Sequence, residues 1–261
     1  PVTLELGGKC PLILAEGNVN ERSVKAFIAM KALKNGQACI APDYVFVPQG
    51  ELESFLSLCR GIMPDMFTSY VESPQCTGII NQRHVDRLVS YLEDAERRGA
   101  RLVQLYPNDE AVNRAQRKVP FTLVLDVTDD MNVMNNEVFG PIIPVMTYGD
   151  LDDVLSYVNT HERPLAVYCY TKDKSIADRI LKGTCSGGVC FNAIEEQVMQ
   201  PSMPFGGVGG SGIGRYSGTE GFKTFSNQRS VYRKGWSPIP ADTFYPPYGK
   251  KLDRIMRLVF R

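Results

Sequence analysis

The chain has 261 residues and is 43% hydrophobic, which is enough to bury one large core or two modest ones. Lysine plus arginine number 29 and aspartate plus glutamate also number 29, so no net charge attracts nucleic acid or an anionic membrane. Only two histidines are present, and the seven cysteines never pair as CxxC, which excludes most zinc-site and Ser/His/Asp patterns. We expect no bound metal.

The cysteine usage and the hydropathy pattern predict a cellular setting. An odd number of scattered cysteines suits free thiols in a reducing cytosol. No apolar run approaches the roughly 18 to 20 residues that span a bilayer, and no charged-then-apolar signal segment opens the chain. We therefore expect a soluble, cytoplasmic protein without a transmembrane segment.

The first 60 residues alternate between strand and helix patterns. Strands are expected at residues 2–6, 11–14 and 44–47. Asn20 is a candidate N-cap of a helix that stops at Asn35-Gly36, and a second helix is expected at 51–59. The apolar face expected for the first helix consists of Val24, Phe27, Ile28 and Leu33.

The same alternation continues through the middle of the chain. Helices are expected from the Asn81 cap to Gly99, at 151–160 and at 174–182. Strands are expected at 102–105, 121–127, 142–147, 165–170 and 188–191, with a polar loop at 106–120. This order predicts an α/β fold with a largely parallel open sheet and flanking helices.

The pattern changes after Asn192. Residues 207–212 match GxGxxG, but no buried strand precedes them and no helix follows, so we interpret them as a backbone-permissive turn. A polar strand is expected at 228–233. Residues 250–261 predict a basic, amphipathic helix, which we expect to dock on the protein rather than on a membrane.

Cys39 and Glu5 are the candidate catalytic residues. Cys39 lies in the turn Gly36-Gln37-Ala38-Cys39, just past a helix end, where small neighbours leave its sulfur approachable. Glu5 precedes two glycines, which permit close approach of a ligand or of another segment. A thiol nucleophile and a carboxylate base can together make and hydrolyse a thioester.

A third motif, residues 136–141, precedes the strand at 142–147. Its Glu137 and Phe139 are two residues apart, so in an extended segment they face the same side. There the carboxylate could bind a ribose diol while the aromatic ring lies against a flat group. A capped turn that happens to hold an acid is an equally good interpretation of the local pattern.

Four motifs occur in order: ELGGK at 5–9, GQACIAPD at 36–43, EVFGP at 137–141 and PFGGVGGSGIG at 204–214. Together they resemble the aldehyde dehydrogenase superfamily over nearly the whole chain. The ending YPPYGK at 245–250 is similar to the class 3 and coniferyl aldehyde dehydrogenase branch.

This resemblance implies a role for each candidate residue. Cys39 would attack an aldehyde, its backbone N–H would hold the oxyanion, and Glu5 would activate the water that hydrolyses the thioester. NAD or NADP would accept the hydride. The residues implied to contact this cofactor are Glu137 at the ribose, Phe139 at the ring, Leu6 and Gly7, and those implied near the substrate are Phe205 and Asn192.

The resemblance also implies a domain organisation. Residues 1–6 would end an N-terminal cofactor-binding domain that precedes Pro1, residues 7–206 would form the catalytic domain, and 207–261 would hold the glycine-rich turn, an oligomerisation strand at 228–233 and the tail. We expect a homodimer or homotetramer, and we expect this chain alone to be inactive. Cys10 departs from the family pattern, which usually has a small Ser, Ala or Asn there.

Two other functions remain open from the sequence. The chain could be a non-catalytic assembly module that oligomerises through 228–233. Alternatively, Cys39 and Glu5 could hydrolyse activated esters without a cofactor.

Overall fold

The computed structural model of this protein describes residues 2–236 and 245–259. Residues up to Phe225 form one compact unit, and the described residues from Ser226 onward belong to a second. The domain boundaries predicted after residues 6 and 206 rest on the family resemblance and stay predictions.

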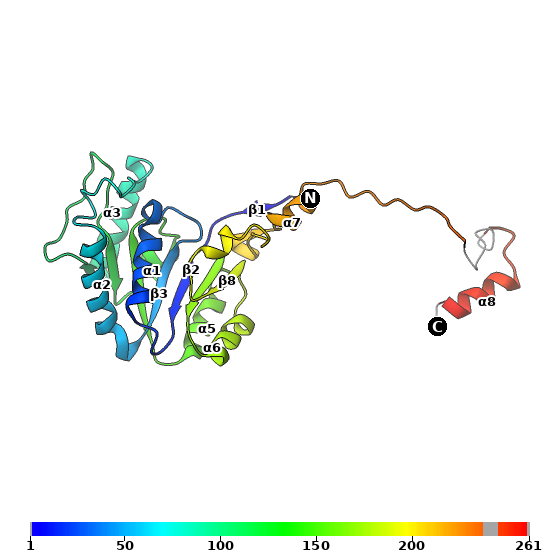
Figure 1. The fold of residues 1–261 in the computed structure, drawn as a ribbon, viewed down its shortest axis with the longest axis horizontal. Coiled ribbons are helices and arrows are strands. Elements are labelled where there is room, and N and C mark those ends of the chain that lie inside the picture. The colour runs from blue at the N-terminus through cyan, green and yellow to red at the C-terminus, as the bar shows by residue number, and fades with distance from the viewer. Residues whose placement is uncertain (1, 237–244, 260–261) are drawn as a thin grey trace. The chain divides into compact units, whose positions relative to one another are not determined.

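A seven-stranded sheet lies at the centre of the first unit, in the order β4-β5-β6-β3-β2-β7-β8 (Figure 1). Its strands are β2 (Cys10–Leu14), β3 (Pro42–Pro48), β4 (Arg101–Gln104), β5 (Thr122–Leu125), β6 (Ile142–Tyr148), β7 (Ala166–Tyr170) and β8 (Gly188–Phe191). Neighbouring strands are parallel except β4 with β5. The predicted α/β fold with a largely parallel sheet is confirmed.

Helices cover both faces of the sheet because its strands are buried on both. In β3, Val45 and Val47 belong to one core cluster while Tyr44 and Phe46 belong to another, since alternate residues of a strand point to opposite faces. Helices α1 (Glu21–Ala32) and α2 (Leu52–Met66) pack on the first face. The second face carries α3 (Gln82–Arg97), the short α4 (Asn132–Asn135), α5 (Leu151–Thr160) and α6 (Lys174–Gly183).

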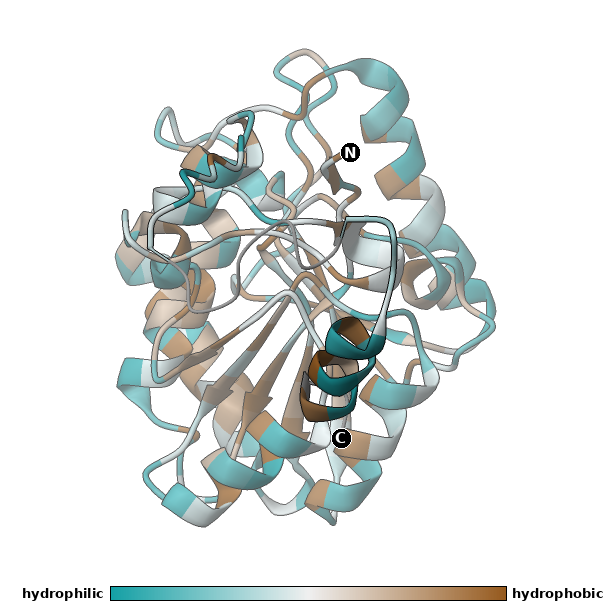
Figure 2. Ribbon diagram, turned by 90° about the vertical axis from the view of Figure 1, so that its right-hand side faces the viewer, coloured by the Kyte–Doolittle hydropathy of each residue, from teal (hydrophilic) through white to brown (hydrophobic). Residues whose placement is uncertain are grey.

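The hydropathy of each element matches its place in these layers. Figure 2 shows hydrophobic strands in the interior and hydrophilic residues on the outward faces of the helices. Each fully buried Val, Leu, Ile or Phe contributes about 1.5 to 3 kcal/mol. Both predicted asparagine caps are confirmed, since the side chains of Asn20 and Asn81 accept hydrogen bonds from the backbone N–H groups of Ser23 and His84.

Two helix predictions are wrong in part. Leu33 is 48% exposed rather than buried, because α1 ends at Ala32 and the chain turns left-handed at Lys34 and Asn35, with φ of 52° and 60°. The short 3-10 segment η1 (Leu33–Gly36) carries that turn. Helix α2 continues past Cys59 to Met66, because Ile62 and Met63 extend its buried face.

A two-stranded sheet forms from distant parts of the first unit. Strand β1 (Leu4–Glu5) pairs antiparallel with β9 (Gly212–Ile213), and β1 is shorter than the expected strand at residues 2–6. A 3-10 turn, η4 (Gly209–Ser211), leads into β9, and helix α7 (Gly218–Thr224) follows it. The glycine-rich segment is thus a turn, as predicted, and not a strand-to-helix loop; its pairing with β1 is seen only in the structure.

The second unit holds helix α8 (Lys250–Val259); Phe260 and Arg261, the end of the predicted helix, lie outside the described residues. Residues 228–233 form no strand in this single chain, because a strand is defined by a paired neighbour and the described residues provide none there. Their proposed pairing across subunits stays a prediction. Among the helices that the structure describes, none is both long and apolar enough to cross a membrane.

Candidate active site

Three of the predicted residues meet beside the amino ends of the parallel strands. Glu5 comes before β2, Cys39 before β3 and Glu137 before β6. Because these strands are parallel, the segments that enter them lie at one edge of the sheet. The fold therefore brings residues from three distant parts of the sequence to the same place.

The Cys39 sulfur lies 3.0 Å from Oε1 of Glu5 and donates a hydrogen bond to it. Pairing of β1 with β9 fixes the backbone of Glu5 opposite Gly212. A Cβ on Gly212 would lie 2.2 Å from the carbonyl oxygen of Leu4, so only glycine allows these strands to approach. The predicted nucleophile and base are thus in direct contact.

In this arrangement Cys39 is a thiol. Burial first, and then the hydrogen bond and charge of Glu5, raise the pKa of Cys39 to about 12 from 9.0. The neutral thiol therefore donates its proton toward the carboxylate. Deprotonation has a ready acceptor in contact with the sulfur.

Tyr216 is a third member of this contact, and no sequence pattern pointed to it. Its hydroxyl donates to Oε2 of Glu5 at 2.5 Å. Burial and the charge of Glu5 raise the pKa of Tyr216 to about 12, so it stays a hydrogen-bond donor at neutral pH. The pairing spans 211 residues of sequence, which no local pattern could indicate.

Glu137 packs against the glycines that follow Glu5. A Cβ on Gly7 would lie 2.5 Å from Oε2 of Glu137, and the backbone N–H of Gly8 donates to its carboxylate. Burial first, and then the charge of Asp43, raise the pKa of Glu137 to about 7. The sequence interpretation is wrong in one respect: Phe139 has a φ of +48°, so the segment is not extended and simple alternation does not place its ring.

Lys9 and Asp43 connect the three segments that lead into β2, β3 and β6, although the sequence analysis proposed no role for them. The ammonium of Lys9 forms an ion pair with Asp43 and donates to the carbonyl oxygens of Val133 at 3.1 Å and Asn136 at 2.9 Å. The other carboxylate oxygen of Asp43, which is buried, accepts from the N–H of Val138 at 2.8 Å. This ion pair holds the Glu137 segment against the other two.

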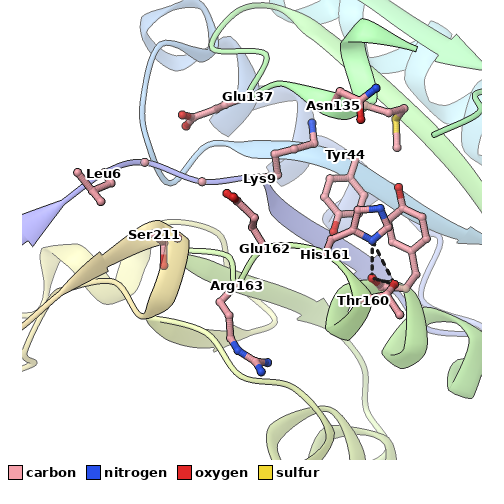
Figure 3. Close-up of a pocket in the computed structure, with 15 residues that line it drawn as sticks. Leu6, Lys9, Tyr44, Asn135, Glu137, Thr160, His161, Glu162, Arg163 and Ser211 are labelled. Carbon is pink, nitrogen blue, oxygen red and sulfur yellow. Dashed lines mark hydrogen bonds between the residues drawn. The ribbon is translucent and has the colours of Figure 1, made fainter. Parts of the chain in front are cut away.

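A cavity of about 520 Å³ opens beside Glu137. Figure 3 shows Leu6 and Lys9 on the segment between β1 and β2, with Glu137 on one side of it and Glu162 and Arg163 on the other. The residues that line this cavity are Leu6, Gly7, Gly8, Lys9, Tyr44, Met134, Asn135, Glu137, Tyr157, Thr160, His161, Glu162, Arg163, Gly210 and Ser211. Three of the four residues predicted to contact a cofactor are therefore on its wall, namely Leu6, Gly7 and Glu137, whereas Phe139 is not among its lining residues.

The two predicted substrate residues lie at different places. Phe205 forms an antiparallel bridge with Tyr216, and their ring centroids are 5.5 Å apart. Since Tyr216 bonds Glu5, a single residue separates Phe205 from the candidate base. Asn192 follows β8, at the opposite ends of the strands from Cys39. Its side chain accepts from the N–H of Thr171, and with a φ of +56° it ends the strand. We therefore leave Asn192 out of the proposed pocket.

A second thiol, that of Cys10, lies close to Cys39. Cys10 is buried beside Cys39, where it donates to the Cys39 carbonyl and accepts from the N–H of Ala166, and burial raises its pKa. Within residues 2–236 and 245–259, no group of three or more His, Cys, Asp or Glu side chains is arranged to hold a metal ion.

The chain is similar to known proteins over nearly all of its length. The sequence profile described as "Aldehyde dehydrogenase family" matches residues 1–231. A probable coniferyl aldehyde dehydrogenase of Pseudomonas aeruginosa is 44% identical over 260 residues, covering 100% of this chain and 53% of that protein. The chain spans about half the length of the curated relatives that it matches.

Solved structures share the fold. The substrate-bound state of AldH from Staphylococcus aureus has a TM-score of 0.88 at 30% identity, covering 100% of this chain and 55% of that one. An NAD+ complex of the aldehyde dehydrogenase from Bacillus cereus has a TM-score of 0.75 at 24% identity, covering 87% of this chain and 46% of that one, a likeness of fold alone.

Proposed function

Because this chain belongs to the aldehyde dehydrogenase family, we propose that it carries the catalytic cysteine of an enzyme that oxidises an aldehyde to a carboxylic acid with NAD or NADP. The activity is proposed for a protein of the relatives' full length, since this chain spans about half of it. The observation that carries the proposal is the 3.0 Å contact between the Cys39 sulfur and the Glu5 carboxylate.

In the first stage, Glu5 accepts the thiol proton of Cys39 and the thiolate attacks the aldehyde carbon. A carbon–sulfur bond forms and the carbonyl electron pair moves to oxygen, where the Cys39 backbone N–H stabilises it. A bound nicotinamide would supply the hydride acceptor that leaves a thioester on Cys39.

Before the second stage Glu5 releases the proton it took from Cys39 to solvent, and its carboxylate then activates water against the thioester. Its carboxylate accepts a proton from water, the hydroxide attacks the thioester carbon, and the carbon–sulfur bond breaks with the electron pair returning to Cys39. Glu5 is exposed, which gives water access to it.

The residues present fit a nicotinamide cofactor. Glu137 offers two carboxylate oxygens at the wall of the cavity, and Gly7 lacks the side chain that would crowd them. We propose that Glu137 holds the ribose hydroxyls, that Leu6 and Gly7 lie along the ring, and that Phe139, 39% exposed, flanks it. The Bacillus cereus aldehyde dehydrogenase, which shares the fold, is described as an NAD+ complex.

The deciding experiment uses a full-length protein with NAD or NADP and coniferyl aldehyde, the substrate named for the Pseudomonas aeruginosa relative. Cys39→Ser should lower the rate of cofactor reduction by at least about a thousandfold. The matched control Cys185→Ser removes an exposed thiol and should leave it unchanged. An undiminished rate in Cys39→Ser would refute the assignment.

Cofactor-free ester hydrolysis is a second candidate, favoured by the presence of both Cys39 and Glu5 in contact within this one chain. It predicts that the 261-residue chain turns over an activated aryl ester without NAD, and that this turnover survives Glu137→Ala. The first proposal predicts no such sustained turnover by the chain alone.

We also propose that the subunits form a homodimer or homotetramer through residues 228–233. Val231 and Tyr232 are 71% and 85% exposed in the single chain, and apolar side chains of this kind favour burial by a partner. Deleting 228–233 should yield monomers by light scattering. If aldehyde also left Cys39 unmodified, the chain would be an assembly module only. Seven free cysteines support a cytoplasmic setting.

A further inference from the structure

Both oxygens of the Glu5 carboxylate have a protein partner. Oε1 accepts from the Cys39 thiol at 3.0 Å and Oε2 accepts from the Tyr216 hydroxyl at 2.5 Å. Glu5 itself is exposed and lies on a strand of only two residues. An exposed glutamate ordinarily samples several rotamers, so these two contacts define where its carboxylate points.

Tyr216 lies on backbone that is held firmly in place. Its N–H and carbonyl exchange two hydrogen bonds of 2.7 Å with Phe205, and the two rings meet edge to face. The neighbouring Arg215 donates to the carbonyl oxygens of Gly187 at 2.5 Å and Gly206 at 2.9 Å. A hydroxyl on such a segment is a fixed point for a mobile carboxylate.

We propose that Tyr216 is a positioning residue that holds Oε2 of Glu5, so that Oε1 faces first the Cys39 sulfur and then the attacking water. The inference rests on the proposed function and goes beyond it, because it assigns a role to a residue outside the catalytic pair. The proton moves between Cys39 or water and Oε1. Tyr216 keeps its own proton throughout, consistent with its raised pKa.

The groups around Cys39 come from several elements. Glu5 on β1 and Glu137 before β6 both raise the Cys39 pKa, and Cys10 at the start of β2 contacts its carbonyl. Of these three groups around Cys39, Glu5 is the one that accepts a hydrogen bond from the Tyr216 hydroxyl. A change at Tyr216 should therefore reach Cys39 through Glu5, and removing the Glu5 charge should abolish the effect.

The test is a double-mutant cycle on the 261-residue chain. The rate of Cys39 alkylation by iodoacetamide is followed from pH 7 to 9, roughly the range below the ordinary thiol pKa, by mass spectrometry of the Cys39 peptide. Tyr216→Phe should change this rate about three- to tenfold in the same direction as Glu5→Gln, the size of one hydrogen bond. In the Glu5→Gln background Tyr216→Phe should have no effect.

Two further variants distinguish a specific effect on Cys39 from a general loss of folding. Tyr148→Phe removes a hydroxyl that bonds Leu14 at the other ends of the strands, and it should leave the Cys39 rate unchanged. Glu5→Asp keeps the charge but shortens the side chain, so Tyr216→Phe should also have no effect in that background. An equal effect of Tyr216→Phe with and without Glu5, or none in the natural chain, would overturn the proposal.

In a full-length enzyme Tyr216→Phe should lower kcat about three- to tenfold through slower thioester hydrolysis, with KM for the aldehyde unchanged. An enzyme that oxidised no aldehyde would refute the proposed function but would leave the alkylation cycle to decide the role of Tyr216.

Discussion

The two ends of the parallel strands differ in how their polar side chains are used. At the carboxyl ends, Asn20, Asp150 and Asp173 cap α1, α5 and α6 through bonds to residues two or three positions away. At the amino ends, the Cys39–Glu5, Asp43–Val138 and Tyr216–Glu5 bonds span 34, 95 and 211 residues.

The caps at the carboxyl ends stabilise local structure, whereas the bonds at the amino ends join the residues of the candidate site. Ligands of open α/β sheets commonly bind outside the carboxyl ends, where helix N-termini point. In this protein three of those helix N-termini are capped by the chain itself, and the reactive groups lie at the amino ends instead. Long-range bonds also occur at the carboxyl ends, as between Tyr148 and Leu14, but the helix caps there are local. Substitution of a side chain that joins segments at the amino ends should therefore have a larger effect than substitution of a cap.

The largest difference in stability is expected when alanine replaces each of two glycines that share a backbone conformation. Gly36 and Gly17 have φ of +69° and +72°, but a Cβ on Gly36 would lie 2.3 Å from the carbonyl oxygen of Gly140, whereas Gly17 meets nothing within 4 Å. Gly36→Ala, at the amino ends, should cost about 3 to 4 kcal/mol and Gly17→Ala about 1 kcal/mol. Urea unfolding of both variants measures this, and equal costs would contradict it.

The next-largest difference in stability is expected when an aspartate is replaced by asparagine at each end of the strands. Asp43→Asn removes the ion pair with Lys9 from a buried site and should cost about 2 to 3 kcal/mol. Asp150→Asn keeps an equally good helix cap and should change stability by less than about 0.5 kcal/mol. The free energies of unfolding in urea decide between them; a neutral Asp43→Asn would show that this pair does not hold the amino ends together.

A smaller effect is expected on the reactivity of Cys39. Glu5→Gln removes a charge and an acceptor that raise the Cys39 pKa, so that pKa should fall and the pH–rate profile of alkylation should move to lower pH by about one unit, or tenfold in rate. Burial remains, so the pKa should stay above that of an ordinary thiol. A profile that moved to higher pH would show that Glu5 does not raise the pKa of Cys39.

The smallest effect concerns the dependence of stability on pH. Burial raises the pKa of Glu137, before β6, and of Glu195, after β8, to about 7 from 4.5. Their neutral forms favour the fold, so the stability that they contribute is complete below pH 4.5 and is lost as pH rises through 7. Glu137→Gln and Glu195→Gln should each flatten this decline in urea titrations, and a steeper decline in either variant would contradict the assignment.

Local patterns predicted an element well where apolar residues recur at the period of a single helix or strand. The bounds expected for α5 and β8 are those observed. The bounds of α2 were wrong because its last turn is fixed by packing of Ile62 and Met63, and Leu33 was misplaced because left-handed residues end the helix period before it.

By itself the sequence determined the α/β order and the asparagine caps and indicated the candidate nucleophile and base, because caps, periodicity and motifs are properties of neighbouring residues. Only the tertiary structure decided that Tyr216 shares the Glu5 carboxylate, that Lys9 and Asp43 join three segments, and that Asn192 bonds Thr171 at the carboxyl ends of the strands. Each of these depends on which strands lie side by side, and that is fixed by packing of the whole sheet rather than by any short segment.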